Sequence, residues 1–191
     1  MYINTATLAY PVSEAQIRAA YPGTSFPDPF LPPPEFSWVF PVPVPPYDPI
    51  TQAYRELAPV VVSGNWTQVF EVYGLTPEQI AANELAHKEQ FLHDAKVNTV
   101  AYLDTFAQTR DYADCDRCCG FSTSSKPQLA NDGSYMTMSR DDVITTGYGI
   151  LNQVQTGAIP VPTMTWYMAQ LPPLAWPTPE TWPAVNGTAV L

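Results

Sequence analysis

Residues 76–111 have the sequence TPEQIAANELAHKEQFLHDAKVNTVAYLDTFAQTRD. Thr76 offers the side-chain oxygen of a helix N-cap, and Gln79 can complete a capping box with it. Pro77 suits the first helical position, where no backbone N–H is needed. The residues that follow favour helix as far as Asp111. This stretch therefore predicts one long α-helix.

The predicted helix carries an apolar stripe whose members recur at alternating intervals of four and three residues. Two interpretations of the stripe stay open. It either packs on its own chain as one face of an amphipathic helix or, being narrow, forms a coiled coil between copies. Lys88 and Thr99 weaken it. The stripe consists of Ala81, Leu85, Lys88, Leu92, Ala95, Thr99, Tyr102 and Phe106, and the candidate oligomer seam is Leu85, Leu92, Ala95, Tyr102 and Phe106.

Two strands are predicted before this helix, over residues 54–62 and 65–73. Gly64, in the turn between them, suits a backbone position with positive φ. Apolar residues occur on both faces of the second strand, so we expect both sides of the hairpin to be covered. A lone hairpin is marginally stable in water, so it needs the helix or a neighbouring subunit to support it.

The 22 prolines gather at the two ends of the chain, with thirteen at or before Pro59 and seven at or after Pro160. Proline fixes φ and removes a backbone donor, so these ends are predicted to be extended. We expect them to gain order by lying on other chains. Within the N-terminal end, residues 13–20 predict a short capped helix and residues 36–42 predict one edge strand.

The part of the chain after the long helix is predicted to be mainly helical. Residues 111–132 are polar and irregular, with a turn of helix around the cysteines. A second helix is expected from Ser139, an N-cap followed by acidic residues, to Gly157. A last short helix is expected over residues 164–171.

These features together predict an α+β fold, with a small β-hairpin or meander region, then a long helix and a helical C-terminal part, and extended Pro-rich arms. The predicted segments are an N-terminal arm with one short helix (1–49), a β-hairpin (50–75), a helical region (76–171) that contains the cysteine loop (111–132), and an extended tail (172–191).

The three cysteines, Cys115, Cys118 and Cys119, lie within five residues. A structural zinc site needs four ligands, and the nearest histidines lie more than twenty residues away, so this cluster disfavours a metal site. A redox motif would need a βαβ context that the sequence does not predict. Two interpretations stay open: reduced thiols, or a disulfide within the chain or to another subunit. We expect no metal and no cofactor.

Composition restricts the classes of function. The net charge of −10 argues against nucleic acid as a partner, and no apolar run is long enough to span a membrane. Charged residues are only 14% and aromatic residues 13%, a balance that suits contacts between subunits. The sequence has no recognisable catalytic motif, so we expect the chain not to be an enzyme. Its first residues do not resemble a signal peptide, so we expect synthesis in a cytoplasm.

Several stretches resemble small tail proteins of tailed bacteriophages. The resemblance covers most of the chain, apart from the unusual cysteine cluster at Cys115–Cys119. It is carried by YPVSEAQIR (10–18), PGTSFP (22–27), YDPITQ (47–52), NWTQVFEV (65–72), LTPEQIAAN (75–83), YLDTFAQTR (102–110) and LPPLAWP (171–177).

The resemblance implies a structural virion component of the tail, which forms tail fibres or attaches to them near the baseplate and supports adsorption to the host. It implies other tail or fibre subunits as partners, a homo-oligomer, with a trimer as the expected form, and contact with the host surface. The chain would be made in the host cytoplasm and reside in the tail. One alternative is a fibre assembly chaperone that leaves the virion, and another is a receptor-binding tip whose Trp and Tyr side chains stack on host sugars.

Overall fold

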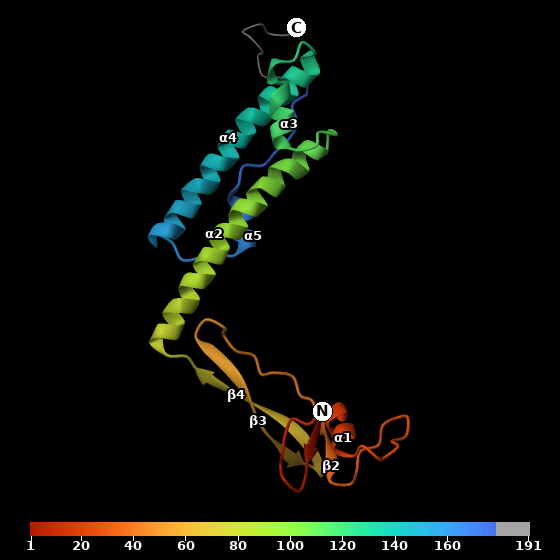
Figure 1. Cartoon of the computed structure of the whole chain (residues 1–191). Coiled ribbons are helices and arrows are strands. Elements are labelled where there is room, and N and C mark those ends of the chain that lie inside the picture. Colours follow the sequence, from red (N-terminus) through yellow and green to blue (C-terminus); the bar gives the residue numbers. More distant parts are fainter. Residues whose placement is uncertain (179–191) are drawn as a thin grey trace. The chain divides into compact units, whose positions relative to one another are not determined.

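The computed structural model describes residues 1–178 and has an α+β fold, which confirms the predicted class (Figure 1). The chain divides into two compact units, residues 1–83 and 84–191. The boundary lies inside the long helix α2 (Pro77–Gln108). The tail predicted from residue 172 is described as far as Thr178, and the rest of it lies outside the described residues. Within residues 1–178, no helix has the length and apolar character needed to cross a membrane.

The first unit is built on a sheet of four strands in the order β1-β2-β4-β3. The predicted hairpin is present, and its two central turn residues, Ser63 and Gly64, both have positive φ. This is the backbone of the two-residue turns that match the twist of paired strands. The elements are β1 (Tyr2–Asn4), α1 (Glu14–Ala20), β2 (Phe36–Phe40), β3 (Gln52–Val62) and β4 (Asn65–Gly74).

The prediction that residues 36–42 form an edge strand is wrong. β2 lies inside the sheet, where its residues Phe36–Trp38 pair antiparallel with β1 and Val39 and Phe40 pair parallel with β4. The alternation of side chains predicted a strand, but it contains no information about the partners on either side. Pairing of residues so distant in sequence is decided by tertiary contacts.

The N-terminal arm lies on its own chain. Ile3, Ile17 and Val39, from β1, α1 and β2, are buried, so the arm supplies the small core of the first unit. Its capping box at Ser13 and Gln16 is formed as predicted. We expected this arm to gain its order from other chains, but residues 1–49 already pack on their own chain.

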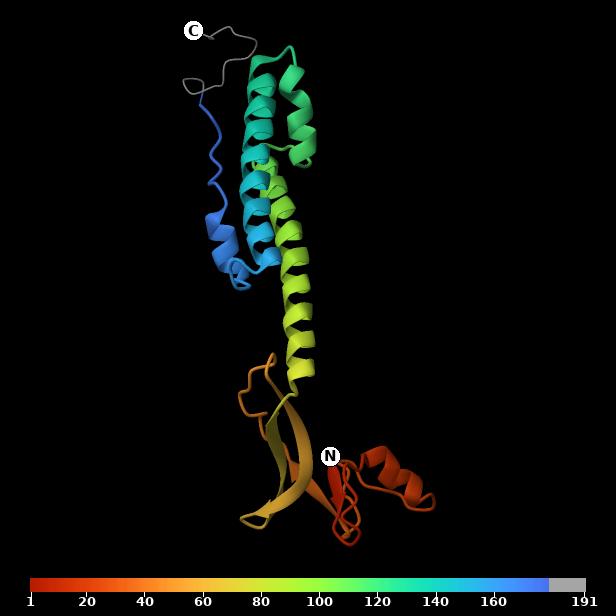
Figure 2. The same cartoon turned by 90° about the vertical axis from the view of Figure 1, so that its left-hand side faces the viewer.

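The second unit is a set of helices around one hydrophobic core. α2 and α4 (Pro127–Thr156) lie side by side and run in opposite directions (Figures 1 and 2). The short α5 (Met164–Gln170) packs beside them, and α3 (Cys115–Cys119) and the 3-10 turn η1 (Gly120–Thr123) pack on the start of α4. The capping box at Thr76 and Gln79 that opens α2 is formed as predicted.

The second helix, α4, starts at Pro127, which is twelve residues before the predicted start at Ser139. Gly133 lies in this additional part, and its missing side chain lets η1 approach the helix closely. A Cβ atom added at Gly133 would lie 2.3 Å from the backbone nitrogen of Ser122. Tertiary packing therefore overrides the low helix propensity of residues 131–133 and the cap signal at Ser139.

We expect Gly133→Ala to destabilise the second unit by about 3 kcal/mol, because the backbone of η1 would have to move away from α4. Urea unfolding followed by circular dichroism measures the change. Gly149→Ala is the matched control, since Gly149 lies in the same helix with no atom within 4 Å of the added Cβ. The control should stabilise the protein by up to about 1 kcal/mol. Equal unfolding free energies for the two variants would contradict this account of Gly133.

Candidate functional site

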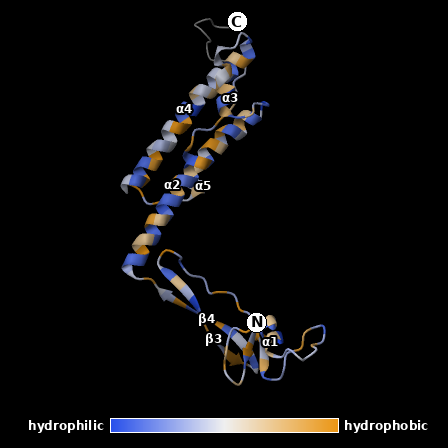
Figure 3. Cartoon of the chain, viewed as in Figure 1, coloured by the Kyte–Doolittle hydropathy of each residue, from blue (hydrophilic) through white to orange (hydrophobic). Residues whose placement is uncertain are grey.

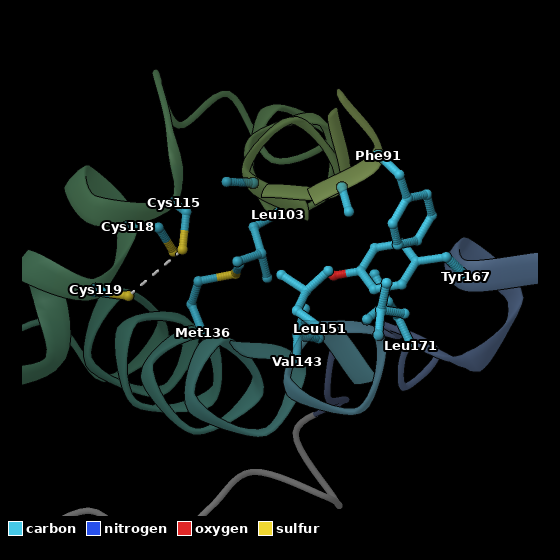
Figure 4. Packing of buried hydrophobic residues seen from close by; sticks show 13 residues of the cluster. Phe91, Leu103, Cys115, Cys118, Cys119, Met136, Val143, Leu151, Tyr167 and Leu171 are labelled. Atoms are coloured by element: carbon cyan, nitrogen blue, oxygen red, sulfur yellow. Dashed lines mark hydrogen bonds between the residues drawn. The ribbon is translucent and has the colours of Figure 1, made fainter. Parts of the chain in front are cut away.

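The three cysteines lie in the core of the second unit, and all three are free thiols. The sulfur atoms of Cys115 and Cys119 are 4.0 Å apart, one helical turn from each other (Figure 4). The Cys118 thiol donates to the backbone carbonyl of Asp132 at 3.7 Å. The local disulfide is therefore absent from this structure. A bond to another subunit stays a prediction, against which the burial of all three sulfurs argues.

Burial also lowers the expected reactivity of Cys115 and Cys118. Desolvation, followed by the neighbouring Cys119, raises the pKa of both Cys115 and Cys118 to about 12. Since the thiolate is the nucleophile and the metal ligand, thiols of such pKa are poorly suited to either role. Within residues 1–178, no three side chains of the metal-binding types are gathered as a metal site would require.

A buried carboxylate, Asp132 on α4, organises the end of the second unit. Its side chain is 1% exposed and forms an ion pair with Arg110, while the hydroxyl of Tyr112 donates to its second oxygen at 3.1 Å. Burial and the charge of Asp132 raise the pKa of Tyr112 above its ordinary value. An open cleft of about 780 Å³ lies beside this cluster, with Arg110, Tyr112 and Asp132 in its wall. Because the carboxylate is already paired, we interpret the cluster as a structural tie.

The buried face of α2 is not the predicted seam. The helix buries residues at regular intervals of four, and of the seam residues only Ala95 is among them. Leu92, Tyr102 and Phe106 are half-buried at the border of the core, and Leu85 is exposed. The described helix therefore packs on its own chain, and pairing between copies stays a prediction. The buried positions are Phe91, Ala95, Thr99, Leu103 and Ala107.

The main exposed feature of the first unit is one face of its sheet. Residues directly opposite each other on paired strands share a face. Phe40 pairs with Thr67, and Thr67 pairs with Val60, so these three lie in one row across β2, β4 and β3. Six large apolar side chains belong to this face, which we call the apolar sheet face, and each is 38% to 52% exposed. They are Trp38, Phe40, Leu57, Val60, Val62 and Tyr73.

A β-bulge produces the continuity of this face. Leu57 pairs with Val69 and Val60 pairs with Thr67, so β3 has one extra residue between these pairs. The bulge at residues 58–59 returns Val60 and Val62 to the same side as Leu57. The sequence signal that could have revealed it is Pro59, because proline inside a strand is typical of bulges and edges.

The opposite face of the sheet is partly covered by the chain itself. Glu56 and Gln68 on that face are hydrogen-bonded to each other, and both also contact the hydroxyl of Tyr10. Tyr47 packs edge-on against Tyr54. The expectation that both sides of the hairpin are covered is therefore met in part for this side, where Tyr54 and Val61 are still 43% and 56% exposed. Apart from the edge of the Tyr2 ring on Trp38, the described part of the first unit leaves the apolar sheet face open. Figure 3 shows where apolar residues lie along the strands.

The apolar sheet face carries no net charge. Arg55 and Glu71 lie opposite each other on it and form an ion pair at 2.6 Å. The guanidinium of Arg55 also lies 5.7 Å from the centre of the Tyr73 ring. A neutral, aromatic and aliphatic surface on a strongly acidic chain is typical of protein–protein contacts.

Comparisons with protein-family models, with curated proteins and with solved structures found no match to this chain. The resemblance to bacteriophage tail proteins therefore stays a prediction from the sequence.

We expect the cysteines of the native protein to react with a thiol reagent at pH 8 on the order of a hundredfold more slowly than in urea.

The folded-state pKa of Cys115 and Cys118 is raised, so these thiols stabilise the fold fully below the unfolded pKa of about 8.5. This stabilisation should disappear as the pH rises toward about 12. The double variant Cys115→Ala/Cys118→Ala should lose less unfolding free energy between pH 8 and pH 11 than the wild-type chain does. Fast labelling of the native protein would contradict the buried positions.

Proposed function

We propose that this chain is a structural component of a bacteriophage tail, which forms tail fibres or attaches to them near the baseplate and there supports adsorption to the host. The observation that carries the proposal is the apolar sheet face, a broad neutral surface that the described part of the first unit leaves exposed. Leaving several large apolar side chains in water is unfavourable, and covering them with another subunit removes that cost. The low content of charged residues and the resemblance in the sequence support the same conclusion.

The other tail subunits that cover this face would also complete the first unit, whose buried apolar side chains are few. A sheet with a small core gains stability when a second layer packs on it. Oligomerisation of the chain, with a trimer as the expected form, belongs to the same proposal.

A second candidate is the fibre assembly chaperone that leaves before the virion is finished. The observation that favours it is the cis packing of both Pro-rich ends, since residues 1–49 supply the core of the first unit and residues 171–178 lie on the second. A protein that orders its own ends can fold alone, as a transient helper must.

We expect Val60→Lys/Val62→Lys, introduced into the gene in its own genome, to lower the amount of this chain in purified particles at least about tenfold, because charges cannot be buried unpaired against a partner. Quantitative mass spectrometry of the particles measures this amount. The control is Val97→Lys, at an exposed position of α2 outside the sheet.

Circular dichroism of the purified variants confirms that folding is retained. Equal incorporation of both variants would contradict the role of the apolar sheet face. Absence of the wild-type chain from finished particles, together with its presence on unassembled fibres, would favour the chaperone.

A further inference from the structure

The last described residues form an extended segment, which we call the C-terminal strap (Leu171–Thr178). It follows α5 and runs along the second unit beside the paired helices (Figure 2). Pro172, Pro173 and Pro177 keep it out of helix and sheet. Leu171 and Pro177 are buried, so the strap is attached at both ends.

The backbone of the strap is held by side chains of the helices. The hydroxyl of Tyr102 donates to the carbonyl of Pro172 at 3.0 Å, and the N–H of Ala175 donates to the hydroxyl of Tyr135, also at 3.0 Å. An extended Pro-rich backbone forms no hydrogen bonds within itself. Its carbonyl and N–H groups can therefore bond to the tyrosine hydroxyls in this way.

Trp176 anchors the strap. Its ring stacks on Phe106 with 4.4 Å between centroids and 19° between planes, and its indole N–H donates to Thr109 at 2.7 Å. The guanidinium of Arg110 lies 4.7 Å from the ring centre, and Tyr112 and Tyr135 surround it. Stacking, cation–π contact and a satisfied indole N–H together make a specific pocket for tryptophan.

The surface under the strap has the chemistry of a peptide-binding groove. We call it the aromatic groove, and it consists of Tyr102, Phe106, Thr109, Arg110, Tyr112 and Tyr135. Aromatic side chains that pack on a Pro-rich segment, with hydroxyls that bind its backbone, are the means by which proteins recognise polyproline-type ligands. Here the occupant comes from the same chain.

We propose that the aromatic groove is a binding site for a Pro-rich segment with a tryptophan, and that it accepts the C-terminal strap of a second copy in exchange for its own. An exchange of this kind re-forms the same contacts between two copies, so it costs no new interface. The strap carries no charged residue, so it can enter the groove of an acidic neighbour without burying a charge.

Concentration decides which strap occupies the groove. The chain's own strap has an effective concentration on the order of millimolar, so it prevails in dilute solution. Copies held side by side in an assembly offer each other straps at comparable concentration, and exchange would then link them. This inference is independent of the function proposed above, because it concerns the second unit alone.

The first experiment uses the full chain with Trp176→Ala and a fluorescent peptide of sequence LPPLAWPT, which is the strap itself. We expect fluorescence anisotropy to show saturable binding, at least tenfold tighter than to the wild-type chain, whose own strap competes. The same peptide with alanine in place of its tryptophan is the control and should not bind. If the strap were only a packing element, Trp176→Ala would lower stability without creating a site. Absence of peptide binding to the folded variant would therefore overturn the proposal.

The second experiment tests exchange between copies. The Trp176→Ala chain has an intact groove and a damaged strap, whereas a Phe106→Ala chain has a damaged groove and an intact strap. Mixed at high concentration, they should form a heterodimer by native mass spectrometry, while Trp176→Ala alone stays monomeric. Thr109→Val, which removes only the partner of the indole N–H, replaces Phe106→Ala if circular dichroism shows that the latter is unfolded. Peptide binding without mixed dimers in either combination would overturn exchange between copies.

Discussion

The buried carboxylate of Asp132 is the constraint on which the second unit depends. A carboxylate removed from water must be neutralised by an opposite charge and by hydrogen bonds. Arg110 and Tyr112 supply both, and they come from the turn that directly follows α2. The same guanidinium lies over Trp176, so one ion pair connects α4, the turn after α2 and the C-terminal strap. The ion pair between Arg110 and Asp132 thus contacts α4, the turn after α2 and the strap.

The two units differ in how much apolar surface they bury. The second buries a continuous cluster of apolar side chains from all of its helices, including the three thiols (Figure 4). In the first, few side chains are buried, and one face of the sheet alone turns six large apolar residues to water. The contrast assigns different roles to the units. One has a continuous core of its own, and the other has the surface that we propose a partner covers.

Local signals in the sequence predicted local structure well. The capping boxes at Ser13 and Thr76 and the turn at Gly64 depend on neighbouring residues only, and all three are formed as expected. Features that depend on distant contacts could not be predicted. These include the sheet partners of β2, the early start of α4 against η1, the rotated buried face of α2 and the return of the strap to its own chain. The cysteine cluster was visible in the sequence, but its burial was not, because burial is a property of the packed core.

β3 lies at the edge of the sheet, where an exposed strand can recruit further strands without limit. Pro59 lies in the middle of that strand and has no N–H to donate to an incoming backbone. The β-bulge at residues 58–59 also bends the edge of β3 on either side of it. Growth by adding strand to strand is thereby interrupted. The partner that we propose for the flat of the sheet would make a contact that ends once this surface is covered, and such a contact would give assemblies of finite size rather than fibrils.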